Sequence, residues 1–188
     1  MTKSRAVLIA ACLSAAANRV GGEEPGKPKM DQAPKAPQQL GEAFKFFDGP
    51  WKCVTKFAEG AMGPGSPAVT VNTTVRFKKD LDGWFYRGDY EAPKTKSMPS
   101  IKGDLRISYQ PGAQVFVMTS HDNTGAVEYA TSPGFRGDSI AFTGEAYMMG
   151  QKMAVRETMT KRGKECSHTT EIDRGKGFEA VGEDSCKR

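Results

Sequence analysis

Apolar and polar residues alternate with a period of two along most of the chain after Trp51, and this alternation limits what the chain can fold into. Successive side chains of a β-strand point to opposite faces, so alternation places one face in a core and the other in water. The clearest stretch has Val69, Val71, Thr73, Val75 and Phe77 on one face and Thr70, Asn72, Thr74, Arg76 and Lys78 on the other. The pattern predicts an antiparallel sheet with one hydrated face.

Turn residues divide this part of the chain into segments of strand length. The later candidate strands span residues 84–91, 101–109, 114–120, 125–131, 138–144, 151–160, 164–173 and 177–186. Short signals such as Asp82-Gly83, Pro111-Gly112 and Gly175-Lys176-Gly177 separate them. Roughly ten short strands in succession indicate a β-sandwich or an up-and-down barrel. No helical segment lies between them, which excludes a parallel α/β sheet.

One short helix is expected ahead of the strands, over residues 38–47. Leu40, Phe44 and Phe47 recur at helical spacing and give this segment a single apolar face. Asp48-Gly49-Pro50 then ends the helix, because glycine and proline both break it.

Residues 1–17 have the layout of a signal peptide. Lys3 and Arg5 supply positive charge, residues 6–13 are apolar, and residues 15–17 are alanines suited to cleavage. We therefore expect export to the periplasm or the extracellular medium. As an alternative, residues 9–12 resemble a lipobox, which would make the protein an outer-membrane lipoprotein with a lipid anchor at Cys12. The short apolar stretch before Cys12 favours ordinary cleavage.

Residues 18–37 are predicted to be a disordered linker. They contain Pro25, Pro28, Pro34 and Pro37 and almost no large apolar side chain, so they cannot bury enough surface to fold. The domain organisation is therefore a signal peptide at 1–17, a linker at 18–37 and one barrel domain at 38–188. The formal net charge of +5 comes from basic residues scattered among acidic ones, which argues against a nucleic-acid partner. No apolar run is long enough for a transmembrane span.

No catalytic motif is found, so we expect a protein that is not an enzyme. Ser120, His121 and Asp122 are adjacent, and neighbours on a strand point to opposite faces, so they cannot form a catalytic triad. His121 and His168 show no zinc-site spacing, and we expect neither a metal nor a cofactor. His168 lies on an inward face and is the one candidate for an axial haem ligand. A hydrogen-bonded structural histidine is the favoured interpretation.

Several segments together resemble a lipocalin-like (calycin) bacterial family, the uncharacterised domain-of-unknown-function family 1579. They are Gly49-Pro50-Trp51 directly after the helix and residues 77–90, 103–109, 131–134, 142–153 and 183–187. The resemblance covers residues 38–188. It implies an all-β, antiparallel up-and-down barrel of about ten strands with a short N-terminal helix, and it implies no established activity. The best-known lipocalins place a last-strand arginine across the Gly-x-Trp indole. Only Arg188 is available here, and its position at the chain end argues against that packing.

The inward-facing side chains include large rings and a few polar groups that suit a pocket wall. The pocket candidates are Trp51, Trp84, Tyr86, Tyr109, Met153 and Glu157. They favour a barrel that binds a small apolar or amphipathic ligand in its interior. Two alternatives remain: a structural or interaction module of the cell envelope with a fully packed barrel, and an enzyme that uses a cavity carboxylate such as Glu157.

Three cysteines, Cys53, Cys166 and Cys186, lie in the predicted domain, all on inward faces. In a closed meander the first strand lies beside the last, which brings Cys53 to Cys186. Across the hairpin that turns at residues 175–177, Cys166 also faces Cys186. Of the two pairings, Cys53–Cys186 closes the longer loop and so restricts the unfolded chain more. The cysteine positions in the resemblance favour the same pairing. We predict Cys53–Cys186 with Cys166 free, and Cys166–Cys186 as the alternative.

Overall fold

The structure is a computed structural model that describes residues 34–188. The predicted signal peptide, the alternative anchor at Cys12 and most of the predicted linker lie outside the described residues. Residues 34–37 have no regular secondary structure and lead directly into the first helix.

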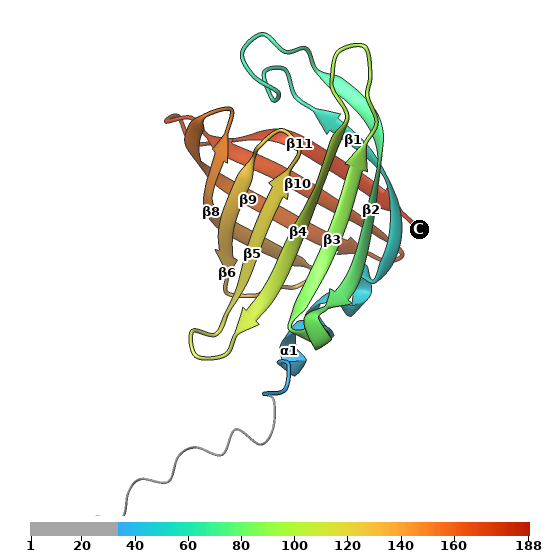
Figure 1. The fold of residues 1–188 in the computed structure, drawn as a ribbon, viewed down its shortest axis with the longest axis vertical. Coiled ribbons are helices and arrows are strands. Elements are labelled where there is room, and N and C mark those ends of the chain that lie inside the picture. The colour runs from blue at the N-terminus through green and yellow to red at the C-terminus, as the bar shows by residue number, and fades with distance from the viewer. Residues whose placement is uncertain (1–33) are drawn as a thin grey trace, which may run out of the picture. The chain divides into compact units, whose positions relative to one another are not determined.

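The chain forms one antiparallel sheet that closes on itself (Figure 1). The strands are β1 (Gly49–Phe57), β2 (Val69–Asp80), β3 (Phe85–Ala92), β4 (Ile101–Gln110), β5 (Val115–Asp122), β6 (Val127–Ser132), β7 (Phe135–Arg136), β8 (Ser139–Met148), β9 (Gln151–Arg162), β10 (Glu165–Asp173) and β11 (Phe178–Lys187). Each strand pairs with the next along the chain except at β7, which is a two-residue addition to β8. Closure comes from β1 pairing with β11 and β6 pairing with β8. The predicted up-and-down barrel is therefore confirmed.

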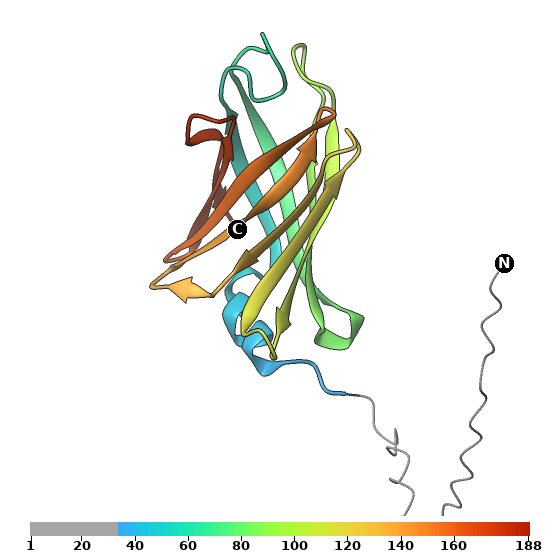
Figure 2. The same cartoon turned by 90° about the vertical axis from the view of Figure 1, so that its left-hand side faces the viewer.

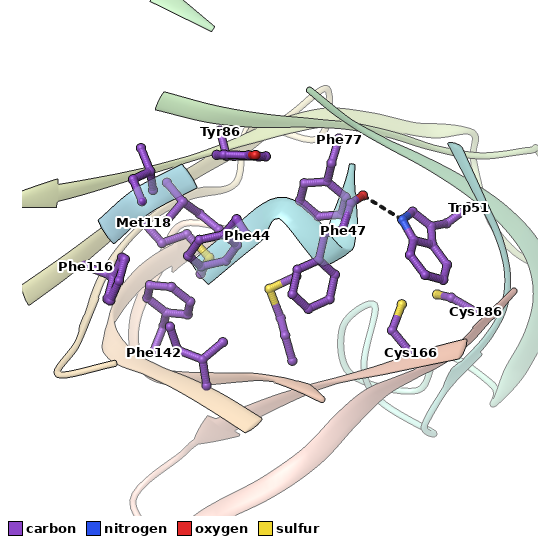
Figure 3. Close-up of a cluster of buried hydrophobic side chains, with 14 of the residues drawn as sticks. Phe44, Phe47, Trp51, Phe77, Tyr86, Phe116, Met118, Phe142, Cys166 and Cys186 are labelled. Atoms are coloured by element: carbon purple, nitrogen blue, oxygen red, sulfur yellow. Dashed lines mark hydrogen bonds between the residues drawn. The ribbon is translucent and has the colours of Figure 1, made fainter. Parts of the chain in front are cut away.

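The predicted helix is present as α1 (Gln38–Phe44) followed by the 3₁₀ turn η1 (Lys45–Phe47). It lies at one end of the barrel, which we call the helix end (Figures 1 and 2). Its apolar face, Leu40, Phe44 and Phe47, is completely buried, as the helical spacing of these residues predicts. These side chains pack against inward-facing residues of the strands, including Phe77, Tyr86, Phe116 and Phe142 (Figure 3).

The other end of the barrel, which we call the loop end, has its own apolar packing. Ala146, Met153, Val155, Ile172 and Val181 form one cluster there, together with Ala61 of the β1–β2 loop. A second cluster joins Val71, Ala92 and Ile101 to Met98 of the β3–β4 loop. The barrel interior is therefore apolar at both ends.

Trp51 connects the start of the barrel to the end of the chain. Its indole Nε1 donates a hydrogen bond to the Phe47 carbonyl at 2.7 Å. The Arg188 guanidinium lies 4.7 Å from the Trp51 ring centroid and donates to the carbonyls of Phe46 and Asp48. The expectation that Arg188 is too close to the chain end for this packing is therefore wrong. The antiparallel pairing of β1 with β11 brings the last residue back beside the helix end.

Candidate functional site

A band of polar side chains crosses the middle of the barrel interior, between the two apolar ends. We call it the polar layer. Its members are Thr55 of β1, Thr73 of β2, Tyr90 of β3, Ser120 of β5, Glu128 of β6, Glu157 of β9, His168 and Thr170 of β10, and Asp184 of β11. Successive side chains of a strand point to opposite faces of the sheet. Each of these residues lies on the same face as buried apolar neighbours on its strand, so it faces inward.

His168 lies between two carboxylates and contacts both. Its Nε2 lies 2.6 Å from Glu157 Oε2, and its Nδ1 lies 2.8 Å from Asp184 Oδ2. Burial alone would lower the pKa of His168, but the charges and hydrogen bonds of the two carboxylates outweigh it and hold the pKa well above its ordinary value. The imidazole is therefore protonated at neutral pH, and it balances charge that the barrel would otherwise bury unpaired.

Hydroxyl groups extend this contact along the wall of the barrel. Thr170 donates to Glu157 Oε2 at 2.8 Å, and Thr55 donates to Asp184 Oδ1. Thr55 also shares a 2.6 Å hydrogen bond with Thr73. Burial raises the pKa of Asp184, yet the hydrogen bond and charge of His168 and the Thr55 hydroxyl keep it below its ordinary value. One hydrogen-bonded chain thus runs from β9 through β10, β11 and β1 to β2.

Glu128 belongs to the same layer but stands outside this chain. Its Oε1 is buried and has no hydrogen-bond partner among residues 34–188. Burial and the nearby charge of Glu157 raise the pKa of Glu128 to about 8, against a smaller opposing effect of His168. The Glu128 carboxyl therefore keeps its proton at neutral pH and can exchange it under mild conditions.

Tyr90 completes the layer on the side of β3. Burial raises the pKa of its hydroxyl to about 12, and the charges of Asp122, Glu128 and Glu157 act in the same direction. The ring lies over Gly103 of β4, where a Cβ atom would come within 2.4 Å of the Tyr90 hydroxyl oxygen. Gly103 therefore makes room for this tyrosine to point into the barrel.

The polar layer borders free space inside the barrel. The His168 side chain keeps 31% of its surface accessible and that of Asp184 keeps 20%, although both face inward between paired strands. Surface on the inner side of a closed sheet can be accessible only if the interior is not filled there. A hollow of about 270 Å³ beside the same two strands is a separate feature of the outer surface, because most of its lining residues, such as Glu165, Ser167 and Ser185, face outward.

The predicted pocket residues divide among four places. Trp51, Tyr86 and Tyr109 belong to the packing at the helix end, where Tyr86 is completely buried and donates to Asp48 Oδ2 at 3.4 Å. Met153 packs at the loop end. Trp84 lies just before β3, after the 3₁₀ turn η2 (Leu81–Gly83), and is half-buried. Of the six, Glu157 lies in the polar layer.

A larger hollow of about 750 Å³ lies at the helix end rather than in the polar layer. Trp51, Phe46 and Arg188 line it together with the charged Lys164 and Glu165. It is a groove between the helix and the β9–β10 turn, and the charged side chains along it are those of a solvated surface.

Two features bear on metal and haem chemistry. Residues 34–188 contain no group of three or more histidine, cysteine, aspartate or glutamate side chains placed to hold a metal ion. Both ring nitrogens of His168 are taken up by carboxylates, so neither has a lone pair directed at free space. The polar layer can form hydrogen bonds with a polar group that enters it, and Glu128 can exchange a proton with such a group.

The cysteines are arranged as predicted. Cys53 and Cys186 form a disulfide with a Cα–Cα distance of 4.0 Å, and Cys166 is free and buried. Burial and the charge of Asp184 raise the pKa of the Cys166 thiol to about 11, against a smaller opposing effect of Arg188, so it is not a reactive thiolate at neutral pH.

Together these observations define a closed, ten-stranded antiparallel barrel of the lipocalin-like type with a polar interior layer. Comparison with known proteins adds no relative, because no family model matches the chain and no curated protein is significantly similar to it. No helix within residues 34–188 has the length and apolar character needed to cross a membrane.

Proposed function

We propose that this protein binds a small amphipathic molecule inside its barrel. The observation that carries the proposal is the polar layer itself, which has accessible surface on His168 and Asp184 and lies between two apolar ends. A ligand with a polar group and an apolar body matches this arrangement, because the polar group can meet the polar layer and the body can lie against an apolar end. Binding sites of this kind combine apolar walls with a few well-placed polar groups.

A fully packed barrel is the alternative, and the charges in the interior count against it. Buried charges destabilise a fold unless they are paired, and replacing such pairs by apolar side chains is often neutral or stabilising. A purely structural barrel would gain nothing from the unpartnered Oε1 of Glu128. Groups that a structural role does not require are expected where a ligand binds.

We propose binding rather than catalysis. The layer's histidine is held protonated between Glu157 and Asp184, so it cannot act as a general base. Glu128 can exchange a proton near neutral pH, but Ser120, its register partner on β5, makes no hydrogen bond to its buried Oε1, so residues 34–188 show no nucleophile–base contact there.

The setting of this activity is proposed from the sequence. Residues 1–17 favour export, with the periplasm or the extracellular medium as the place of action, and the Cys53–Cys186 disulfide is compatible with an oxidising compartment. Membership of the uncharacterised lipocalin-like family remains a proposal that rests on the motifs from Gly49 onward.

Thermal unfolding with a ligand panel tests the binding proposal. Decylamine, decanol and decanoate share one hydrocarbon tail and differ in the polar group. At least one is expected to raise the melting temperature, because a ligand that binds only the native state stabilises it. Ser120→Trp, which fills the interior beside Glu128, should abolish the shift. Thr119→Trp, on the outer face of the same strand, should preserve it. If no compound shifts the melting temperature, the packed module becomes the better interpretation.

A further inference from the structure

The polar layer carries more acidic than basic side chains. Glu128, Glu157 and Asp184 supply three carboxyl groups, and His168 supplies one positive charge. Both contacts of Glu157 fall on Oε2, and no group within residues 34–188 binds its Oε1, although Glu157 is only 7% exposed. Glu128 Oε1 is also without a partner in the described part of the chain. Two carboxyl oxygens thus point into the interior with no protein donor to meet them.

The surroundings of Glu128 contain acidic groups and one cation that is already paired. On β5 the facing groups are Ser120 and Asp122, and on β3 the facing group is Tyr90. On β9 and β10 they are Glu157 and His168. The neighbouring strand β8 presents only Gly144 and Ala146 on that face. No free lysine or arginine faces Glu128 from these strands.

Resting on the proposed function, we infer that the molecule bound in the barrel is an amphipathic amine, whose ammonium group binds Glu128 and Glu157 and displaces the proton of Glu128. The O–H bond of the Glu128 carboxylic acid breaks, and its proton passes to the solvent. The carboxylate that forms pairs with the ammonium ion, which keeps all of its own protons. No electrons are transferred. The occupied layer carries the same net charge as the empty one, because the proton that leaves removes the one positive charge that the ammonium ion brings.

Other polar groups fit this layer less well. The carboxylate of a fatty acid would lie beside Glu157 and Asp184, and the only cation there already contacts both. Like charges brought together in a site with little water repel strongly. An alcohol can donate one hydrogen bond but brings no charge. An ammonium group brings both a positive charge and several donors, and charge-assisted hydrogen bonds are the stronger kind.

The apolar body of the amine has a place at the loop end. Phe57, Val71 and Val155 follow the polar layer along β1, β2 and β9, and all three pack in the apolar clusters of that end. The helix end is filled by the rings around Phe44 and Phe47, so a tail is expected to point away from it (Figure 3).

Isothermal titration of the full chain with decylamine, decanol and decanoate tests the inference. Each titration is run at neutral pH in phosphate and in Tris, whose ionisation enthalpies differ. Decylamine is expected to bind about 10- to 100-fold tighter than decanol, the gain from one charge-assisted hydrogen bond. Its heat should differ between the two buffers by an amount that corresponds to release of up to one proton. Decanol should show no such difference.

Variants identify the source of the proton. Glu128→Gln keeps the shape of the side chain and has no proton to lose, so proton release should disappear and the preference for decylamine should fall about tenfold. Glu183→Gln, exposed on the outer face of β11, should behave like the natural protein. If decanol or decanoate binds as tightly as decylamine, or if Glu128→Gln still releases a proton, the amine inference is wrong while binding stands. If none of the three binds, both proposals fail.

Discussion

Cys166 lies directly opposite Cys186 across the β10–β11 pair, and Cys186 is bonded to Cys53 on its other side. Cys53 is in turn the register partner of Cys186 across β1 and β11. Three inward-facing cysteines therefore stand in a row over three adjacent strands, and the middle one can pair with either neighbour. The observed bond joins the first strand to the last.

Loss of the Cys53–Cys186 disulfide should weaken the whole barrel. The bond closes a loop with a sequence separation of 133 residues, so it restricts the unfolded chain strongly. The double variant Cys53→Ser/Cys186→Ser is expected to lose about 2–5 kcal/mol of unfolding free energy in urea titrations. Cys166→Ser serves as the control and should lose much less. Equal stability of the double variant and the natural protein would contradict the expectation.

The register also predicts which new bond can form. In Cys53→Ser, oxidation by a glutathione redox buffer should link Cys166 to Cys186, because opposed residues on paired strands lie within disulfide reach. In Cys186→Ser, the remaining Cys53 and Cys166 lie on strands separated by β11 and should stay reduced. Peptide mapping without reduction distinguishes the two. A Cys53–Cys166 bond in the second variant would show that the register is wrong.

Arg188 should contribute to stability through its contacts at the helix end. Arg188→Ala removes the guanidinium from the Trp51 ring and from the carbonyls of Phe46 and Asp48. We expect a loss of about 1 kcal/mol, in the range of an exposed cation–π contact with added hydrogen bonds. Arg188→Lys should recover only part of it, because an ammonium group cannot reach both carbonyls from above the ring. Thermal unfolding of both variants measures the difference.

The sequence predicts the barrel because the alternation of apolar and polar residues indicates which face of each strand is buried. The same alternation, with the turn at Gly175, Lys176 and Gly177, predicts the pairing of Cys166 with Cys186, which the structure has. Next to the turn the pairing is one residue away from the predicted register, and a β-bulge between Thr170 and Glu171, which the pattern does not predict, restores it before Cys166. Chain closure then brings Cys53 to the last strand. These predictions need only local pattern and the rule that neighbours in a meander pair.

The polar layer is harder to predict from the sequence, because alternation does not indicate where along the barrel axis a residue lies. Alternation predicts that Glu157 and His168 face inward, but the contacts of this pair with Asp184 and Thr55 depend on the stagger of strands that are distant in sequence. A signal was available: Thr55, Glu128 and Asp184 are polar residues at positions where the pattern expects apolar ones. The contacts of Arg188 at the helix end also depend on strands that are distant in sequence, so the local pattern alone does not predict them.

His168 should stabilise the barrel by pairing with the carboxylates of Glu157 and Asp184. His168→Gln removes the positive charge and leaves Glu157 and Asp184 facing each other in the interior. We expect a loss of about 2–4 kcal/mol at neutral pH, reduced from the value for fully buried pairs because the side chain is partly accessible. His121→Gln, on the outer face beside Asp104, should cost about 0–1 kcal/mol.

Glu128 should make the barrel less stable as the pH rises. Its pKa is about 8 in the folded protein against an ordinary value of 4.5, so between these values the folded state holds a proton that the unfolded state has lost. Unfolding free energy therefore falls with rising pH in this window, by at most about 1.4 kcal/mol per pH unit. His168 has the same sign, because its pKa is also raised, but its effect begins only above its ordinary value of 6.5. Asp184, with a lowered pKa, acts only below 3.8.

The interval from about pH 5 to about pH 6.5 thus isolates Glu128 from the other shifted groups of the layer. Urea unfolding of the natural protein should show a steady fall across this interval. Glu128→Gln cannot ionise, so its unfolding free energy should stay level there and begin to fall only above the interval, where His168 acts. The exposed Glu183→Gln variant should follow the natural protein. A slope in Glu128→Gln as steep as that of the natural protein would mean that the proton is held elsewhere.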